Sequence, residues 1–68
     1  IGIYEIAVPQ KWIGKNMVEL SIRNKYHVSV MATKKENQIS PLPHPSHVFE
    51  ADESVMVMGS AKDIEAIT

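Results

Sequence analysis

Two basic side chains, Arg23 and Lys25, lie two residues apart and shortly before Ser29. An arginine guanidinium can bind a phosphate through two parallel hydrogen bonds, and a neighbouring ammonium adds positive charge. The competing interpretation is an ion pair on the surface of a helix, because Glu19 stands four residues before Arg23. Spacing alone favours the ion pair.

A second candidate is the pair of His44 and His47, separated by Pro45 and Ser46. Imidazole is a common ligand for zinc, but two histidines do not complete a tetrahedral site. Pro45 also prevents the helical geometry that would align residues three apart. Two copies of the chain could supply four histidines at an interface. Histidines on a surface loop are nevertheless the preferred interpretation, and we predict no metal.

Nothing in the sequence indicates catalysis. Cysteine is absent, no Ser-His-Asp arrangement has a supporting motif, and no glycine-rich loop matches a nucleotide-phosphate motif. Glu5 and Glu19 form a possible carboxylate pair, but the first is expected on a strand and the second at a helix cap. We therefore predict that the chain is not an enzyme.

The length of the chain limits its core. Sixty-eight residues make one small domain, and ordering them costs on the order of 100 kcal/mol, at ~1.5 kcal/mol per residue. No disulfide is available, so a second copy of the chain is the simplest way to bury more apolar surface. No apolar run approaches the ~20 residues of a membrane-spanning helix, which predicts a soluble domain. The first residue is Ile1 and not Met, which suggests a fragment of a longer protein.

The net charge of −1 conceals an uneven distribution. Residues 1–35 hold six Lys and Arg against two Glu, whereas residues 36–68 hold one Lys against six Asp and Glu. The basic half could attract a small anion, while the overall charge argues against a nucleic acid polymer as partner. Two solvated faces of opposite charge are the simpler interpretation.

A predicted helix positions the two basic candidates. It runs from about Asn16 to Lys25, with Asn16 as N-cap and Glu19 as its capping-box partner. Before it, Trp12 is expected to anchor a loop in the core, and Gly14 to supply a backbone angle that other residues resist. A second helix is predicted from about Ala61.

Four short strands are predicted at residues 1–8, 28–33, 38–40 and 54–58. In the second strand, Val28, Val30 and Ala32 are expected to face inward, and Thr33 outward. The last strand is apolar at every position from Val55 to Met58, which predicts burial on both faces. After the third strand, Pro41, Pro43 and Pro45 exclude ordinary strand pairing and predict an edge or an extended loop.

The order of these features resembles the C-terminal RCK domain, also called TrkA-C, found in regulators of potassium transport. The resemblance rests on Glu5-Ile6, Val8-Pro9, Trp12 to Lys15, Glu19-Leu20, Ile22-Arg23, Lys25-Tyr26, Val28 to Ala32, Ile39 to Pro41, Phe49, Asp52 and Val55 to Gly59. It covers nearly the whole chain. It implies an α+β fold with a mostly antiparallel sheet and two helices, and residues 1–68 as one regulatory ligand-binding domain that forms a two-fold dimer.

The resemblance further implies a regulatory ligand in the groove between two copies, which in several bacterial members of the family is cyclic di-AMP. The ligand is itself two-fold symmetric, so each copy would hold one phosphate and one adenine. Arg23 falls on the family's phosphate-binding arginine, and Pro41 on the proline that flanks the base. The implied ligand-binding residues are Ile22, Arg23, Asn24, Val28, Ser29, Val30 and Pro41.

Two positions depart from the family pattern. Ser29 stands where cyclic di-AMP binders can carry an asparagine, and it can give one hydrogen bond but not two. His27 stands at the helix end where the family usually has glycine, in a position expected to be left-handed.

The resemblance also implies a larger protein with a nucleotide-binding domain upstream. That protein is expected in the cytoplasm, at the inner face of the membrane, on a potassium channel or transporter. Two alternatives stay open. The domain could be a dimerisation module without a ligand, serving a transporter of another ion or solute, or its interface could be linked by a metal.

Overall fold

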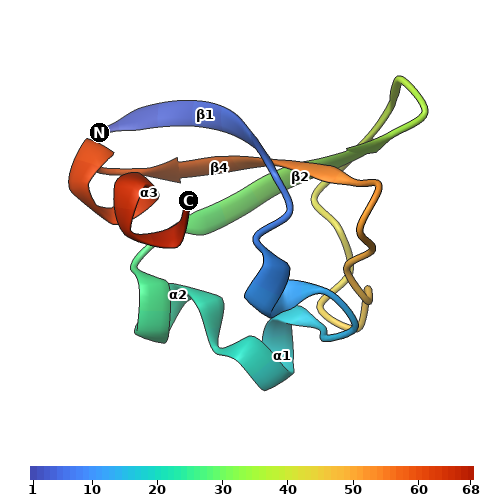
Figure 1. Ribbon diagram of the computed structural model, residues 1–68, viewed down its shortest axis with the longest axis horizontal. Coiled ribbons are helices and arrows are strands. Elements are labelled where there is room, and N and C mark those ends of the chain that lie inside the picture. The colour runs from blue at the N-terminus through green and yellow to red at the C-terminus, as the bar shows by residue number, and fades with distance from the viewer.

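The computed structural model describes all 68 residues. They form a four-stranded antiparallel sheet with helices on one side of it (Figure 1). The elements are β1 (Gly2–Ala7), the 3-10 helix η1 (Gln10–Trp12), α1 (Met17–Leu20), α2 (Ile22–Tyr26), β2 (Ser29–Lys35), β3 (Gln38–Pro41), β4 (Ser54–Gly59) and α3 (Ala61–Ile67). The strand order is β1-β4-β2-β3. The predicted α+β class and antiparallel sheet are confirmed. None of the helices has the length and apolar character that crossing a membrane requires.

The core lies between the central strand β4 and the helices. Val55 and Val57 are completely buried, and Trp12 packs between Tyr26 and Phe49, with ring centroids 5.7 and 5.4 Å away. The expectation that Trp12 is a core anchor is therefore confirmed. The expectation that β4 is buried on both faces is wrong, because no helix covers its second face and Met58 is 37% exposed.

A β-bulge at Met31 changes which side chains of β2 face the core. The pairing with β4 shifts between Val30 and Ala32, so that Thr33 lies opposite Val55. Thr33 is buried as a result, contrary to the prediction that it faces outward. A bulge inserts one extra residue into a strand and so moves the following side chains to the other face.

The predicted helix at residues 16–25 is present but divided at Ser21. Its N-terminal capping box is confirmed: Glu19 N–H donates to Asn16 Oδ1 at 2.9 Å, and Asn16 N–H donates to Glu19 Oε1 at 3.1 Å. Ser21 adopts a left-handed conformation with φ 48° and separates α1 from α2. Residues two apart face different sides of a continuous helix, so this break allows Leu20 and Ile22 both to reach the core.

Left-handed residues also occur at the two turns that the sequence singles out. Gly14 has φ 83°, as expected for a position that other residues resist. His27 ends α2 with φ 61°, and its N–H donates to Arg23 O at 3.2 Å. The expected left-handed helix end is thus confirmed, with histidine in place of glycine.

Candidate functional site

A cavity of about 390 Å³ lies where α1 and α2 meet the start of β2. Its lining residues are Met17, Val18, Ser21, Ile22, Arg23, Asn24, Ser29, Val30 and Pro45. Helix α1 supplies apolar groups, α2 supplies the basic and amide groups, and β2 supplies a hydroxyl. Ser21, the left-handed residue between α1 and α2, is itself one of the lining residues, so the cavity lies at the helix break.

Arg23 is the only charged side chain in the lining. The ion pair with Glu19 that spacing alone favours is absent, since no ion pair of the protein includes Arg23. The Glu19 carboxylate instead accepts the N–H of Asn16 at the start of α1. Arg23 is exposed and has no acidic partner, so its guanidinium is available to an anion at the cavity.

Five of the seven residues expected to bind a ligand lie together in this cavity, namely Ile22, Arg23, Asn24, Ser29 and Val30. The other two lie elsewhere. Val28 is buried in the hydrophobic core, and Pro41 ends β3, where it pairs with Ala32. Lys25, the second basic candidate, lies outside the lining, with its Nζ 5.5 Å from the centre of the Tyr26 ring.

Sequence reasoning missed four lining residues: Met17, Val18, Ser21 and Pro45. The first three lie on α1 and at the helix break that ends it, and the local sequence carries no glycine or proline that would mark this break. Pro45 belongs to the proline run after β3, and a proline ring is a rigid, apolar surface. The three prolines therefore indicated a rigid, apolar segment, but their spacing could not show which proline reaches the cavity.

The two histidines have separate partners. His44 Nδ1 lies 2.7 Å from Ser46 Oγ, and His47 donates from Nε2 to the Glu53 carboxylate at 2.8 Å. No group of three or more His, Asp or Glu side chains is arranged to hold a metal ion.

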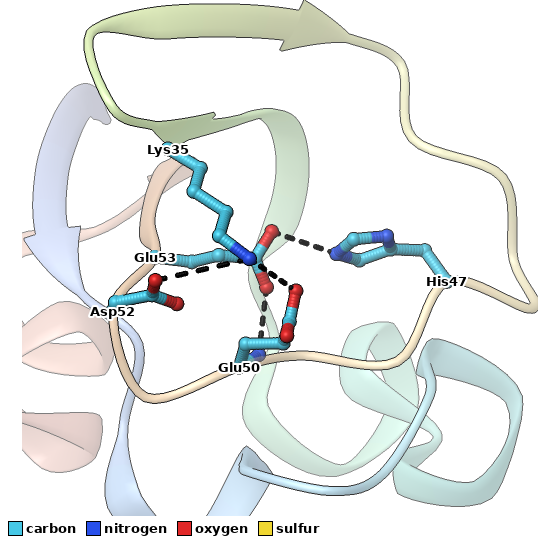
Figure 2. A network of polar contacts seen from close by, with 5 residues as sticks. All are labelled: Lys35, His47, Glu50, Asp52 and Glu53. Carbon is cyan, nitrogen blue, oxygen red and sulfur yellow. Dashed lines mark hydrogen bonds and ion pairs between the residues drawn. The ribbon is translucent and has the colours of Figure 1, made fainter.

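A polar network lies beside His47, at the loop that leads into β4 (Figure 2). Lys35 donates to Glu50 Oε1 at 2.8 Å and lies 3.7 Å from Asp52. The hydrogen bond to Glu50, helped by the charge of Asp52, raises the pKa of Lys35. Glu53 is different, because its side chain is only 3% exposed and is held by His47 and by the N–H of Glu50 at 2.7 Å.

A second exposed contact joins β1 to β4 and β2. Ser54 Oγ donates to Glu5 Oε2 at 2.9 Å, and Lys34 Nζ lies 3.4 Å from the same oxygen. The hydrogen bond from Ser54, followed by the charge of Lys34, lowers the pKa of Glu5. Glu5, Lys34 and Ser54 all lie outside the lining of the cavity at α1 and α2.

Comparison with known proteins finds similarity along almost the whole chain. The family model of the TrkA-C domain matches residues 2–68. The Ktr system potassium uptake protein A of Bacillus subtilis (strain 168) is 29% identical over 64 residues, which are 94% of this chain and 29% of that protein. The chain thus spans less than a third of the length of this relative.

Solved structures show the same fold. The RCK C domain of the potassium transport protein KtrA, in complex with cyclic diadenosine monophosphate, superposes with a TM-score of 0.86 at 23% identity, over 96% of this chain and 76% of that one. The RCK_C domain dimer of S. agalactiae BusR, in complex with c-di-AMP, gives a TM-score of 0.81 at 25% identity, over 98% of this chain and 90% of that one.

Proposed function

The chain belongs to the TrkA-C domain family, a family of regulatory domains that are not enzymes, and we propose that it binds cyclic di-AMP between two copies of itself. The observation that carries this proposal is the composition of the cavity. One unpaired arginine faces a recess whose other walls are apolar or uncharged. Such a lining suits a ligand that combines a phosphate with a flat base.

Each lining group has a role that its chemistry supports. Arg23 binds a phosphate oxygen pair through its two parallel N–H groups. Ile22, Val30 and Pro45 cover the faces of the adenine, and Ser29 or Asn24 hydrogen-bonds its edge. Ser29 can form fewer hydrogen bonds than an asparagine, so the apolar contacts and the phosphate contact carry more of the affinity.

The geometry also supports a dimer. Val18 lines the cavity and is 68% exposed, so a single copy leaves part of the recess open to solvent. A second copy about a two-fold axis would cover this rim and present a second Arg23 to the second phosphate. Two structural relatives support the arrangement, one described as a complex with cyclic diadenosine monophosphate and the other as a dimer with c-di-AMP.

At the level of the whole protein, we propose a cytoplasmic regulator at the inner face of the membrane, acting on potassium transport. The support is the similarity to a potassium uptake protein along almost all of this chain. Ligand binding regulates transport only if it favours one arrangement of the dimer over another, because equal affinity for both would shift nothing.

Calorimetric titration of the 68-residue chain with cyclic di-AMP tests the proposal. The expected result is saturable binding with one ligand per two chains, and no comparable binding of AMP. A chain that dimerises but releases no heat with cyclic di-AMP would contradict the proposal and favour a dimerisation module without a ligand.

A further inference from the structure

The loop between β3 and β4, residues 42–53, brings Pro45 to the wall of the cavity. His47 N–H donates to His44 O at 2.9 Å, so residues 44–47 form a hydrogen-bonded turn. Pro45 occupies the second position of this turn, where its fixed φ angle is favoured. Ser46 N–H adds a bond to His44 Nδ1 at 3.1 Å. The turn is therefore well ordered internally, and its placement against the cavity depends on what holds it to the rest of the protein.

The two ends of the turn are attached unequally. Before it, Leu42 N–H donates to Met31 O at 2.9 Å. After it, Phe49 is buried and exchanges two backbone hydrogen bonds with the chain before α1, through Lys15 O and Gly14 N–H. Among residues 43–47, the side chain of His47 makes the only hydrogen bond that reaches beyond the turn, and its partner is Glu53.

Glu53 is a firm anchor for this contact. Its side chain is buried, and its second oxygen accepts the N–H of Glu50 at 2.7 Å. Its own backbone carbonyl accepts the N–H of Val8 at 3.1 Å, which ties it to the end of β1. Figure 2 shows the His47 ring pointing from the loop directly at this carboxylate. Without the His47 donor, the buried Glu53 carboxylate would lack one of its hydrogen-bond partners. The hydrogen bond between the two side chains is therefore strongly favoured over a state in which His47 turns to solvent.

We infer that the hydrogen bond from His47 to Glu53 positions the Pro45 turn as a wall of the ligand cavity. His47 and Glu53 are positioning residues, since neither lines the cavity. The inference rests on the proposed function for its ligand, cyclic di-AMP, but the placement of the turn is a property of the chain alone. Losing the contact would free the turn, and the ligand would then have to order it on binding.

The test compares three variants by calorimetric titration with cyclic di-AMP. His47→Leu removes the donor and keeps an apolar contact with the Phe49 ring, whose centroid is 5.6 Å away. His47→Gln restores an N–H donor near the position of Nε2. Lys35→Met is the matched control, because it removes the other side-chain link of the same loop, the one to Glu50.

The expected result for His47→Leu is an affinity about three- to tenfold lower, because ligand binding would then have to immobilise one or two further groups of the freed turn. His47→Gln and Lys35→Met are expected to bind like the wild type. Equal affinity in all four proteins would overturn the inference. So would an equal loss in Lys35→Met, which would show that general attachment of the loop, and not the His47 contact, matters.

A second measurement decides the inference without the ligand. Backbone ¹⁵N order parameters of Ser46 and His47 should fall in His47→Leu and keep their wild-type values in His47→Gln and Lys35→Met. If the wild type fails to bind cyclic di-AMP, the proposed function fails while these order parameters still test the placement of the turn. Unchanged order parameters in His47→Leu would overturn the inference.

Discussion

At the scale of single residues, the availability of Arg23 depends on a contact made by a different residue. Glu19 is close enough in sequence to neutralise it, but the Glu19 carboxylate accepts the N–H of Asn16 in the capping box. The cap therefore stabilises the start of α1 and also removes the nearest acidic competitor from Arg23. Spacing could place the two side chains near one another, but it could not decide which of two local partners Glu19 would choose.

We expect Arg23→Ala to weaken cyclic di-AMP binding at least about a hundredfold. Each symmetric ligand would lose two charge-assisted phosphate contacts, one per copy, at ~1.5–3 kcal/mol each. Arg23→Lys should restore only part of the affinity, because an ammonium lacks the planar fork. Lys25→Ala is the control, since Lys25 lies outside the lining. Calorimetry measures all four affinities, and equal values for wild type and Arg23→Ala would contradict the role of Arg23.

A second prediction at this scale concerns how the stability of the fold decreases at acidic pH. The pKa of Glu5 lies below its ordinary value of 4.5, first because Ser54 donates to it and then because of Lys34. A lowered folded-state pKa stabilises the fold above pH 4.5 and loses this effect as the pH falls through the lowered pKa. Ser54→Ala and Lys34→Met should each raise the Glu5 pKa, as read from an NMR titration of the carboxyl carbon. An unchanged pKa in Ser54→Ala would show that the hydrogen bond is not maintained in solution.

At the scale of elements, local signals were predictable and packing effects were not. The capping box at Asn16 follows from residues within a few positions of each other. The left-handed end at His27 was expected because the family usually has glycine at this position. The break at Ser21 lets Leu20 and Ile22 both be buried in the core, and the bulge at Met31 aligns Thr33 with Val55 of β4. Both irregularities therefore serve packing against other parts of the protein. Nothing in the nearby sequence marks either irregularity. Most of the fold was therefore predictable, while the cavity, which lies at the Ser21 break, was predictable only through the family resemblance.

The end of α2 gives a prediction of its own. His27 has φ 61°, a conformation that costs an ordinary side chain about 1–2 kcal/mol and costs glycine little. We expect His27→Gly to stabilise the protein by up to about 1 kcal/mol, because greater freedom of glycine in the unfolded chain offsets part of the gain. His27→Ala, which keeps the left-handed strain, should give no gain. Thermal unfolding followed by circular dichroism distinguishes the two, and a lower midpoint for His27→Gly would contradict the argument.

At the scale of the whole molecule, one side of the sheet carries all the helices and the other carries none (Figure 1). Large apolar side chains stay exposed on a chain of only 68 residues, among them Val18 beside the cavity. A domain of this size buries a smaller fraction of its unfolded surface than a larger domain does, so association is an effective source of further stability. The dimer and the ligand site are thus expected to depend on the same surface.

We expect the chain to sediment as a dimer at micromolar concentration, and Val18→Glu to shift it toward the monomer. The new carboxylate would lose its hydration where the second copy covers the cavity rim, and this cost opposes association. Ile39→Glu is the control, because Ile39 lies on the edge strand β3, away from the cavity lining. Analytical ultracentrifugation measures the distribution. A wild-type chain that is a stable, folded monomer at this concentration would contradict the dimer.

The place of β4 between β1 and β2 has a consequence for biosynthesis. A ribosome releases the N-terminal end first, yet β1 pairs only with β4, the last of the four strands. Until residues 54–59 have emerged, β2 and β3 can form a hairpin, but β1 has no partner and the future core has no central strand. While residues 1–53 are being synthesised, the apolar side chains of the future core are therefore unprotected and open to chaperones and proteases. The complete four-stranded sheet can form only when the last strand is free.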